Sequence, residues 1–359
     1  MSSFEDLFAL KKPAALATRR LSTSSSSASG FGRVLDIKRS NALGILLSKL
    51  GNFSDVVSGI LTLNDSAVPK SLRDALSNAW PTSEDVSLVV SYTEDARKSD
   101  AAAVDKLDKP ERFVYEVSER VDAEPMLKIW CLRDSIVEIG NSITQQCSIV
   151  NKACSTIIRS EALKSFLAVV LTLGNTMNRG SSVGNAFGFD ISILNTLSAI
   201  KSNDNSCSLL SFALGLAESH APQSFNVPLE LQCVTTLPAF AVSNLRKDAQ
   251  QMAAKASLVE NIALSQTCSD QELKANFNRM VKEIKDVAAI AKSNFDAAEE
   301  SARNLALFSG RSERDLDAFD ADAFLSALSS FVSEFKTERE NRIREKSLQN
   351  KECSVCHCL

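Results

Sequence analysis

FLAVVLTLGNTMNRGSSVGNAFGFDISILNTLSAIKSNDNSCSLLSFALGL, residues 166–216, is the stretch from which the fold follows. In and just before its first part, apolar residues recur every three or four positions, the spacing of one apolar face on an α-helix. They are Ala162, Phe166, Val169, Val170, Leu173 and Met177. Gly180, Gly184 and Gly188 follow within nine residues, so a buried helix leads into a sharp turn of the backbone.

The second half of this stretch predicts another helix with a polar cap. Asp190 has the side chain and position of an N-cap. The apolar residues that follow it are expected to point inward; they are Ile193, Leu194, Leu197 and Ile200. Lys201 and a polar turn end this helix, and a third helix begins after the turn. The plan is therefore helix, turn, helix, turn, helix.

The composition of the whole chain predicts an all-α protein. Its 359 residues include 12 Gly and 8 Pro, too few and too scattered for a protein rich in turns. The net charge of −4 gives no case for nucleic-acid binding. Nine cysteines without a secretory signal indicate reduced thiols, and no apolar run approaches the roughly 18 residues that span a bilayer. We expect a soluble, cytoplasmic protein and no membrane partner.

Residues with catalytic chemistry are scarce. His220 and His357 are the two histidines, and neither a phosphate-binding loop nor a dinucleotide fingerprint is present. The sequence therefore predicts a binding protein that is not an enzyme and has no cofactor. In the tail, ECSVCHCL, Cys356 stands fourth from the end, as in a prenylation motif. A plain disordered tail is favoured over lipidation at Cys356, and both over a metal site.

A helix that begins near Asp36 has one residue on the wrong side for burial. Its apolar stripe lies within an arc of roughly 100° and consists of Leu43, Leu46, Leu47 and Leu50. Ile45 projects to the opposite side, with Lys38 and Asn41. We expect Ile45 to be exposed or to contact a second surface.

Later segments have their own patterns. Thr82 or Ser83 in PTSED is expected to cap a helix, and Pro69, Pro81, Pro110 and Pro125 are expected in loops. A heptad seam is formed by Leu273, Phe277, Met280, Ile284, Val287 and Ala291. Packing within one subunit is favoured over an intermolecular coiled coil. The last helix has an apolar side with Phe324, Leu328, Phe331 and Phe335, followed by a basic run.

Several motifs resemble segments of one protein family and occur in the same order along the chain as in that family. LGNTMNRG, GNAFGFDISIL and L..IKS.D....LL are similar to the core of the formin homology 2 domain, the actin-assembling domain of formins. FEDLFALKK, VLDIKRSNALGILL, PTSED, LALFSG and FLSALSSFVSEFKTERENRIREK match further segments. The resemblance covers nearly the whole chain.

This resemblance implies an elongated multi-helix architecture. Residues 1–12 are expected to form a partial lasso, 13–33 a flexible Ser-rich linker, 34–350 the helical body with knob, three-helix region and post, and 351–359 a Cys-rich disordered tail. Phe4, Leu7 and Phe8 belong to the lasso, which in the family wraps a partner subunit. The family's lasso tryptophan is missing, because Trp80 and Trp130 fall elsewhere as core or helix-end residues.

The resemblance also implies site residues. Ile45 on the knob and Lys201 after the post match actin-contacting positions, with Lys38 and Arg39 as weaker candidates. Gly174, Asn175, Asn178 and Gly180 match the motif that shapes the post. The implied function is an actin-binding, cytoskeletal protein that nucleates filaments and stays with the growing barbed end as a head-to-tail homodimer. The alternative is a monomeric helical scaffold, or a barbed-end capper, that binds actin weakly.

Overall fold

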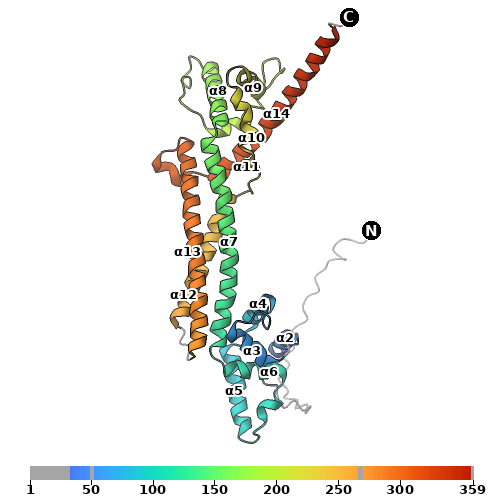
Figure 1. Cartoon of the computed structure of the whole chain (residues 1–359), viewed down its shortest axis with the longest axis vertical. Helices are drawn as coiled ribbons and strands as arrows, with labels where there is room; N and C mark the ends of the chain where they lie inside the picture. The colour runs from blue at the N-terminus through green and yellow to red at the C-terminus, as the bar shows by residue number, and fades with distance from the viewer. Residues whose placement is uncertain (1–32, 49–51, 266–269, 357–359) are drawn as a thin grey trace, which may run out of the picture. The chain divides into compact units, whose positions relative to one another are not determined.

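The computed structural model describes residues 33–48, 52–265 and 270–356. Regular structure in these ranges is helical, apart from one antiparallel bridge between Lys201 and Ser208. The all-α prediction is therefore confirmed. Contacts divide the body into two units (Figure 1): Met1–Gly51 with Pro81–Glu119, and Asn52–Trp80 with Arg120–Leu359.

The first unit contains three α-helices and one 3-10 helix within the described residues. They are α2 (Ile37–Leu47), α5 (Ser83–Arg97), η1 (Ala103–Lys106) and α6 (Lys109–Ser118). Asp36 caps α2 by accepting a hydrogen bond from the Lys38 backbone N–H. Leu43 and Leu47 are buried, as their helical spacing predicted.

A buried carboxylate holds the chain that leads into α2. Glu111, in the first turn of α6, is fully buried. Its Oε1 accepts hydrogen bonds from the backbone N–H groups of Val34 at 3.4 Å and Leu35 at 3.3 Å. These two amides precede the helix and would otherwise lack partners there. Glu111 therefore fixes the point at which α2 begins.

The second unit contains the remaining helices. They are α3 (Phe53–Thr62), α4 (Lys70–Ala79), α7 (Ala123–Arg159), α8 (Glu161–Met177), η2 (Ile191–Thr196), α9 (Leu209–His220), η3 (Pro222–Asn226), α10 (Val227–Glu230), α11 (Gln232–Thr235), α12 (Ala241–Ser265), α13 (Gln271–Phe308), η4 (Glu313–Ala318) and α14 (Ala321–Cys356). The long helices α7, α12 and α13 pack side by side (Figure 1).

The heptad seam packs inside the chain, as favoured from the sequence. Phe277, Met280 and Ile284 of α13 are buried, and α13 lies against α7 and α12. The two longest helices approach closely at Gly140, where an added Cβ would lie 2.7 Å from Cγ1 of Val287. A glycine at this position lets α7 and α13 meet without a gap.

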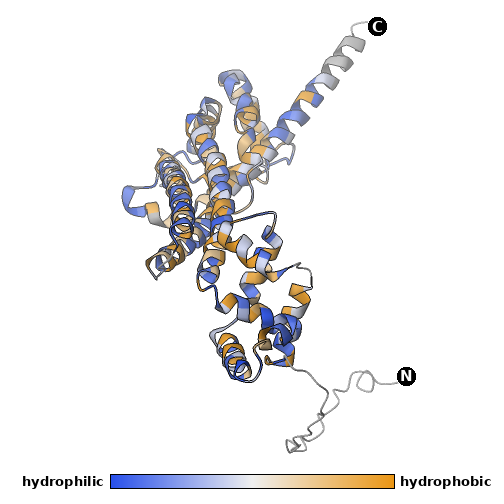
Figure 2. Cartoon of the chain, turned by 60° about the horizontal axis from the view of Figure 1, so that its bottom comes forward, coloured by the Kyte–Doolittle hydropathy of each residue, from blue (hydrophilic) through white to orange (hydrophobic). Residues whose placement is uncertain are grey.

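The apolar side of α14 completes a core with α8. Phe331 and Phe335 are fully buried, and both rings pack against Phe166, with centroids 5.6 and 4.9 Å away. Beyond these rings, residues 336–347 of α14 are mostly hydrophilic (Figure 2). This helix continues to Cys356, into the stretch expected to be a disordered tail, because no Pro or Gly interrupts it.

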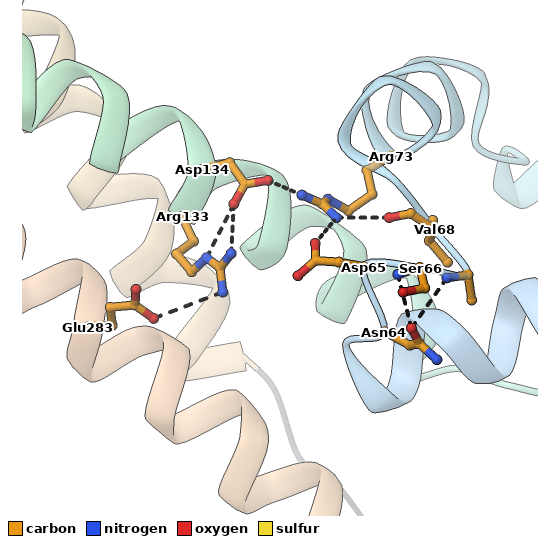
Figure 3. A network of polar contacts seen from close by, with 9 residues as sticks. Asn64, Asp65, Ser66, Val68, Arg73, Arg133, Asp134 and Glu283 are labelled. Atoms are coloured by element: carbon orange, nitrogen blue, oxygen red, sulfur yellow. Dashed lines mark hydrogen bonds and ion pairs between the residues drawn. The ribbon is translucent and has the colours of Figure 1, made fainter.

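A buried arginine of α4 forms an ion pair with the long helix α7 (Figure 3). The Arg73 side chain is 4% exposed, and its guanidinium pairs with Asp65 at 2.6 Å and with Asp134 of α7. It also donates to the Val68 carbonyl and lies 4.1 Å from the ring centre of Trp130. Asp134 in turn accepts hydrogen bonds from Arg133. Trp130 is thus a core residue, as predicted.

Two prolines expected in loops lie inside helices. Pro110 and Pro125 stand in the first turns of α6 and α7. Proline is tolerated there because the first backbone N–H groups of a helix have no intrahelical acceptor. Pro69 and Pro81 do lie outside the helices, and Thr82 forms the expected cap, with a reciprocal bond to Asp85.

Candidate partner-binding surfaces

Ile45 lies on the outward side of α2. Its side chain is 69% exposed, while Leu43 and Leu47 on either side of it in sequence are buried. Lys38, one of the weaker candidates, is also exposed on this helix. The helical-wheel prediction that Ile45 faces away from the core is confirmed. An aliphatic side chain with polar neighbours can bury its surface only against another molecule.

Arg39 is engaged inside its own unit. Its Nε donates to Oδ2 of Asp85 at 3.0 Å, and both side chains are largely covered. Burial raises the pKa of Asp85, but hydrogen bonds from Thr82 and the charge of Arg39 outweigh it, so the pKa lies below its usual value. Arg39 therefore holds α2 to the N-terminus of α5, a role that its place beside Ile45 did not reveal.

Lys201 stands exposed at the base of a tight turn. The bridge to Ser208 and the bond from the Ser202 N–H to the Cys207 carbonyl close this turn. Asp204 braces it from inside by accepting from the Ser202 hydroxyl at 2.5 Å and from both the N–H and the hydroxyl of Ser206. These bonds hold the pKa of Asp204 down at about 2. The cation is thus presented on a braced support.

An apolar groove opens along the C-terminal half of α8. It encloses about 410 Å³ and continues over η2 and the start of α9; we call it the α8 groove. Its apolar lining includes Val170, Leu173, Met177, Val183, Ile193 and Ile200. The predicted residues Gly174, Asn175 and Asn178 line it as well, whereas Gly180 is not part of the lining.

The loop between α8 and η2 is fastened to α8 by one amide side chain. Asn175 accepts a hydrogen bond from the Ala186 N–H at 2.7 Å and donates to the Ala186 carbonyl at 2.9 Å. Gly180 has a φ of +83°, and an added Cβ at Gly184 would lie 2.5 Å from the Asn178 carbonyl oxygen. The Gly/Asn motif therefore forms a turn whose residues Asn178 and Ala186 line the α8 groove.

Two predictions about burial are wrong at the α8 groove. Met177 is 63% exposed, so the buried face of α8 ends near Val170. Ile193 and Ile200 are about two-fifths exposed instead of pointing inward, because they line the groove, while Leu194 and Leu197 are buried as expected. The Asp190 cap is present, although the helix it starts is a 3-10 helix.

Phe187 is a surface residue that the sequence did not single out. Its side chain is fully exposed, and it lies in the same loop as Val183, which is 64% exposed. The signal available in the sequence was the pair of phenylalanines separated by Gly188 in AFGF. An aromatic ring next to a glycine in a loop has no helical face on which to be buried.

Several predicted residues cannot be placed. Phe4, Leu7 and Phe8 lie outside the described residues, as does Leu50. The backbone of Cys356 ends α14, but its side chain is likewise outside the description. Among the described residues there is no group of three potential metal ligands. No described helix is long and apolar enough to cross a bilayer.

The fold and these surfaces define a class: an all-helical protein with exposed apolar and charged side chains on helices and on a braced turn. The profile of the Formin Homology 2 Domain matches residues 1–341, and the chain belongs to this family. Formin-G of Dictyostelium discoideum is 30% identical over 265 residues, which is 72% of this chain and 24% of Formin-G.

Two further relatives match over more of this chain. Formin-like protein 16 of Arabidopsis thaliana is 23% identical over 332 residues, 90% of this chain and 44% of the relative. Disheveled-associated activator of morphogenesis 1-A of Xenopus laevis is 25% identical over 313 residues, 86% of this chain and 28% of the relative. The chain therefore spans less than half the length of each relative named here.

Proposed function

We propose that this chain is an actin-assembly protein that binds the growing barbed end of a filament and nucleates new filaments. The observation that carries the proposal is Ile45, 69% exposed on the polar side of α2 at the position matching the family's actin-contacting isoleucine. Lys201, on its braced turn, supplies the second contact. Lys38 is an auxiliary cation beside Ile45, and Arg39 acts through the placement of α2.

The work of such a protein is geometric. Association of free actin subunits costs translational and rotational freedom, several kcal/mol or more for each subunit. Two binding surfaces on one scaffold turn the second association into an intramolecular step with a raised effective concentration. A filament nucleus then forms more often, with no covalent chemistry. This role fits membership of a family that assembles actin and is not enzymatic.

A pair of chains would double the number of actin-binding surfaces. We infer that the α8 groove receives an apolar segment of a second copy, with Phe4, Leu7 and Phe8 as its anchors. The groove has the apolar lining that such side chains need, and Met177 and Ile200 are open to receive them. Burial of one large apolar side chain contributes about 1.5–3 kcal/mol.

The test is actin assembly followed by pyrene fluorescence. Ile45→Ala and Lys201→Ala are each expected to lower nucleation and barbed-end association at least about tenfold, because each removes an interface contact. Leu88→Ala, which truncates a half-exposed apolar residue on α5, is the matched control and is expected to act like wild type. Two variants that both equal wild type would refute the site.

The molecular mass in solution distinguishes the proposed dimer from the alternative, a monomeric scaffold or capper. Light scattering at micromolar concentration is expected to give twice the chain mass of 38.9 kDa. Asn175→Ala is expected to weaken the dimer about tenfold, because it releases the loop that lines the α8 groove. A monomeric wild-type chain would favour the alternative.

A further inference from the structure

A second groove runs between α14 and the short helices α10 and α11. It encloses about 790 Å³ and shares no lining residue with the α8 groove. We call it the α14 groove. The lining residues used below are Leu229, Val332, Lys336, Arg339, Glu340 and Ile343.

The α14 groove has exposed apolar residues on both walls. Leu229 of α10 is 72% exposed, and Ile343 of α14 is 55% exposed. Val332, at the other end of the α14 wall, is buried. Large aliphatic side chains on facing walls offer a place for an apolar side chain of a partner.

The same groove has cations without acidic partners. Lys336, Arg339 and Ile343 follow at steps of three and four, so they share one side of α14. Neither Lys336 nor Arg339 forms an ion pair with a described residue, and the guanidinium of Arg339 lies 5.8 Å from the ring centre of Phe225 instead. Glu340 is the acid in the lining, so cations exceed acids there.

Two other cations of α14 have acidic partners within the chain. Arg342 donates to the Ser211 carbonyl at 3.1 Å, and Arg342 and Lys346 share Glu218 of α9. Arg342 and Lys346 are thus engaged within the chain, and they fix α14 to α9. Lys336 and Arg339, which line the groove, have no such acidic partner among the described residues.

We propose that the α14 groove is a further actin-binding surface, which takes an acidic segment of an actin subunit that also carries an apolar side chain. This inference rests on the proposed function. The unpaired cations select an acidic partner, and the facing aliphatic walls select one with an apolar anchor. Actin has an acidic surface, so it satisfies the first requirement.

The experiment measures elongation from filament seeds as a function of the concentration of the full 359-residue chain. Lys336→Glu with Arg339→Glu is expected to weaken the apparent affinity for seeds at least about tenfold at low salt, through reversal of two interface charges. The difference should shrink between about 50 and 200 mM KCl, because the Debye length shortens and solvent-exposed charges attract each other less. The double variant Leu229→Ser with Ile343→Ser should weaken the apparent affinity for seeds at both salt concentrations.

Arg344→Glu is the matched control. Arg344 is an exposed cation on the same helix, outside the groove lining, and its reversal should stay within about twofold of wild type. Circular dichroism should show unchanged helix content in every variant. If the groove variants bound seeds as tightly as wild type, or if Arg344→Glu weakened the affinity as much as they do, the α14 groove would not be an actin-binding surface. A wild-type chain without effect on seeds would instead refute the proposed function.

Discussion

At the scale of single residues, Lys38 and Arg39 are neighbours in sequence with different roles. Lys38 is exposed on α2, whereas Arg39 pairs with Asp85 at 3.0 Å. The sequence placed both beside Ile45 as candidate contacts. It could not reveal the ion pair, because Asp85 lies 46 residues away and nothing local links the two.

Arg39→Ala is expected to lower the free energy of unfolding by about 1 kcal/mol at pH 7, because it removes a partly buried ion pair and hydrogen bond. Lys38→Ala should leave it unchanged. The folded-state pKa of Asp85 is below 3.8, so its contribution is present above that pH and is lost as pH falls through the lower value. Urea unfolding at several pH values measures this. An Arg39→Ala effect that persists fully at the acid end would contradict it.

Asp204 braces the turn that carries Lys201. Its pKa of about 2 comes from the Ser202 hydroxyl first, and then from the N–H and hydroxyl of Ser206. In Ser202→Ala with Ser206→Ala the pKa should rise toward 3.8, because both hydroxyl donors are gone. Carboxyl chemical shifts in an NMR titration report it. Ser219→Ala, in α9 and without a bond to Asp204, is the control; no upward shift in the double variant would show that the turn is braced in another way.

At the scale of elements, periodicity predicted the helices that pack within the chain. The buried stripe with Leu43, the seam with Phe277 and the face with Phe331 are all where their spacing placed them. Ile193 and Ile200 have the same kind of spacing, yet they line the α8 groove. Spacing identifies an apolar face, but it does not tell whether this chain or a partner covers that face. The two residues that were expected in the core but are not there, Ile193 and Ile200, therefore line a groove.

The crossing of α7 and α13 depends on Gly140. Gly140→Leu is expected to destabilise the protein by about 1–3 kcal/mol, because the new side chain collides with Val287. Val287→Ala in the same chain should recover part of the loss, so the two changes are non-additive. Thermal unfolding of the single and double variants measures the coupling.

Gly174→Ala is the control for this pair. An added Cβ at Gly174 meets nothing within 4 Å, and alanine is the better helix former by about 1 kcal/mol. Its unfolding temperature should be equal to or above that of wild type. If Gly140→Leu with Val287→Ala were as unstable as the sum of the single variants, the close contact would not be the cause.

At the scale of the whole molecule, the chain forms two units and passes between them three times. Each unit has its own buried residues and its own polar anchor: Glu111 in the first and Arg73 in the second. A unit with a separate core can unfold in a separate transition. The intrinsic probes divide in the same way, because Tyr92 and Tyr115 are in the first unit and both tryptophans are in the second.

We therefore expect two urea transitions, one seen by fluorine NMR of labelled tyrosine and one by tryptophan fluorescence. Arg73→Ala should move the tryptophan transition by about 1–3 kcal/mol, because it removes the buried hydrogen bonds to Asp134 and to the Val68 carbonyl, while Arg133 still pairs with Asp134. Arg73→Ala should leave the tyrosine transition in place. Arg39→Ala should shift the tyrosine transition and leave the tryptophan transition in place. Coincident transitions that shift together in both variants would mean that the two units unfold as one.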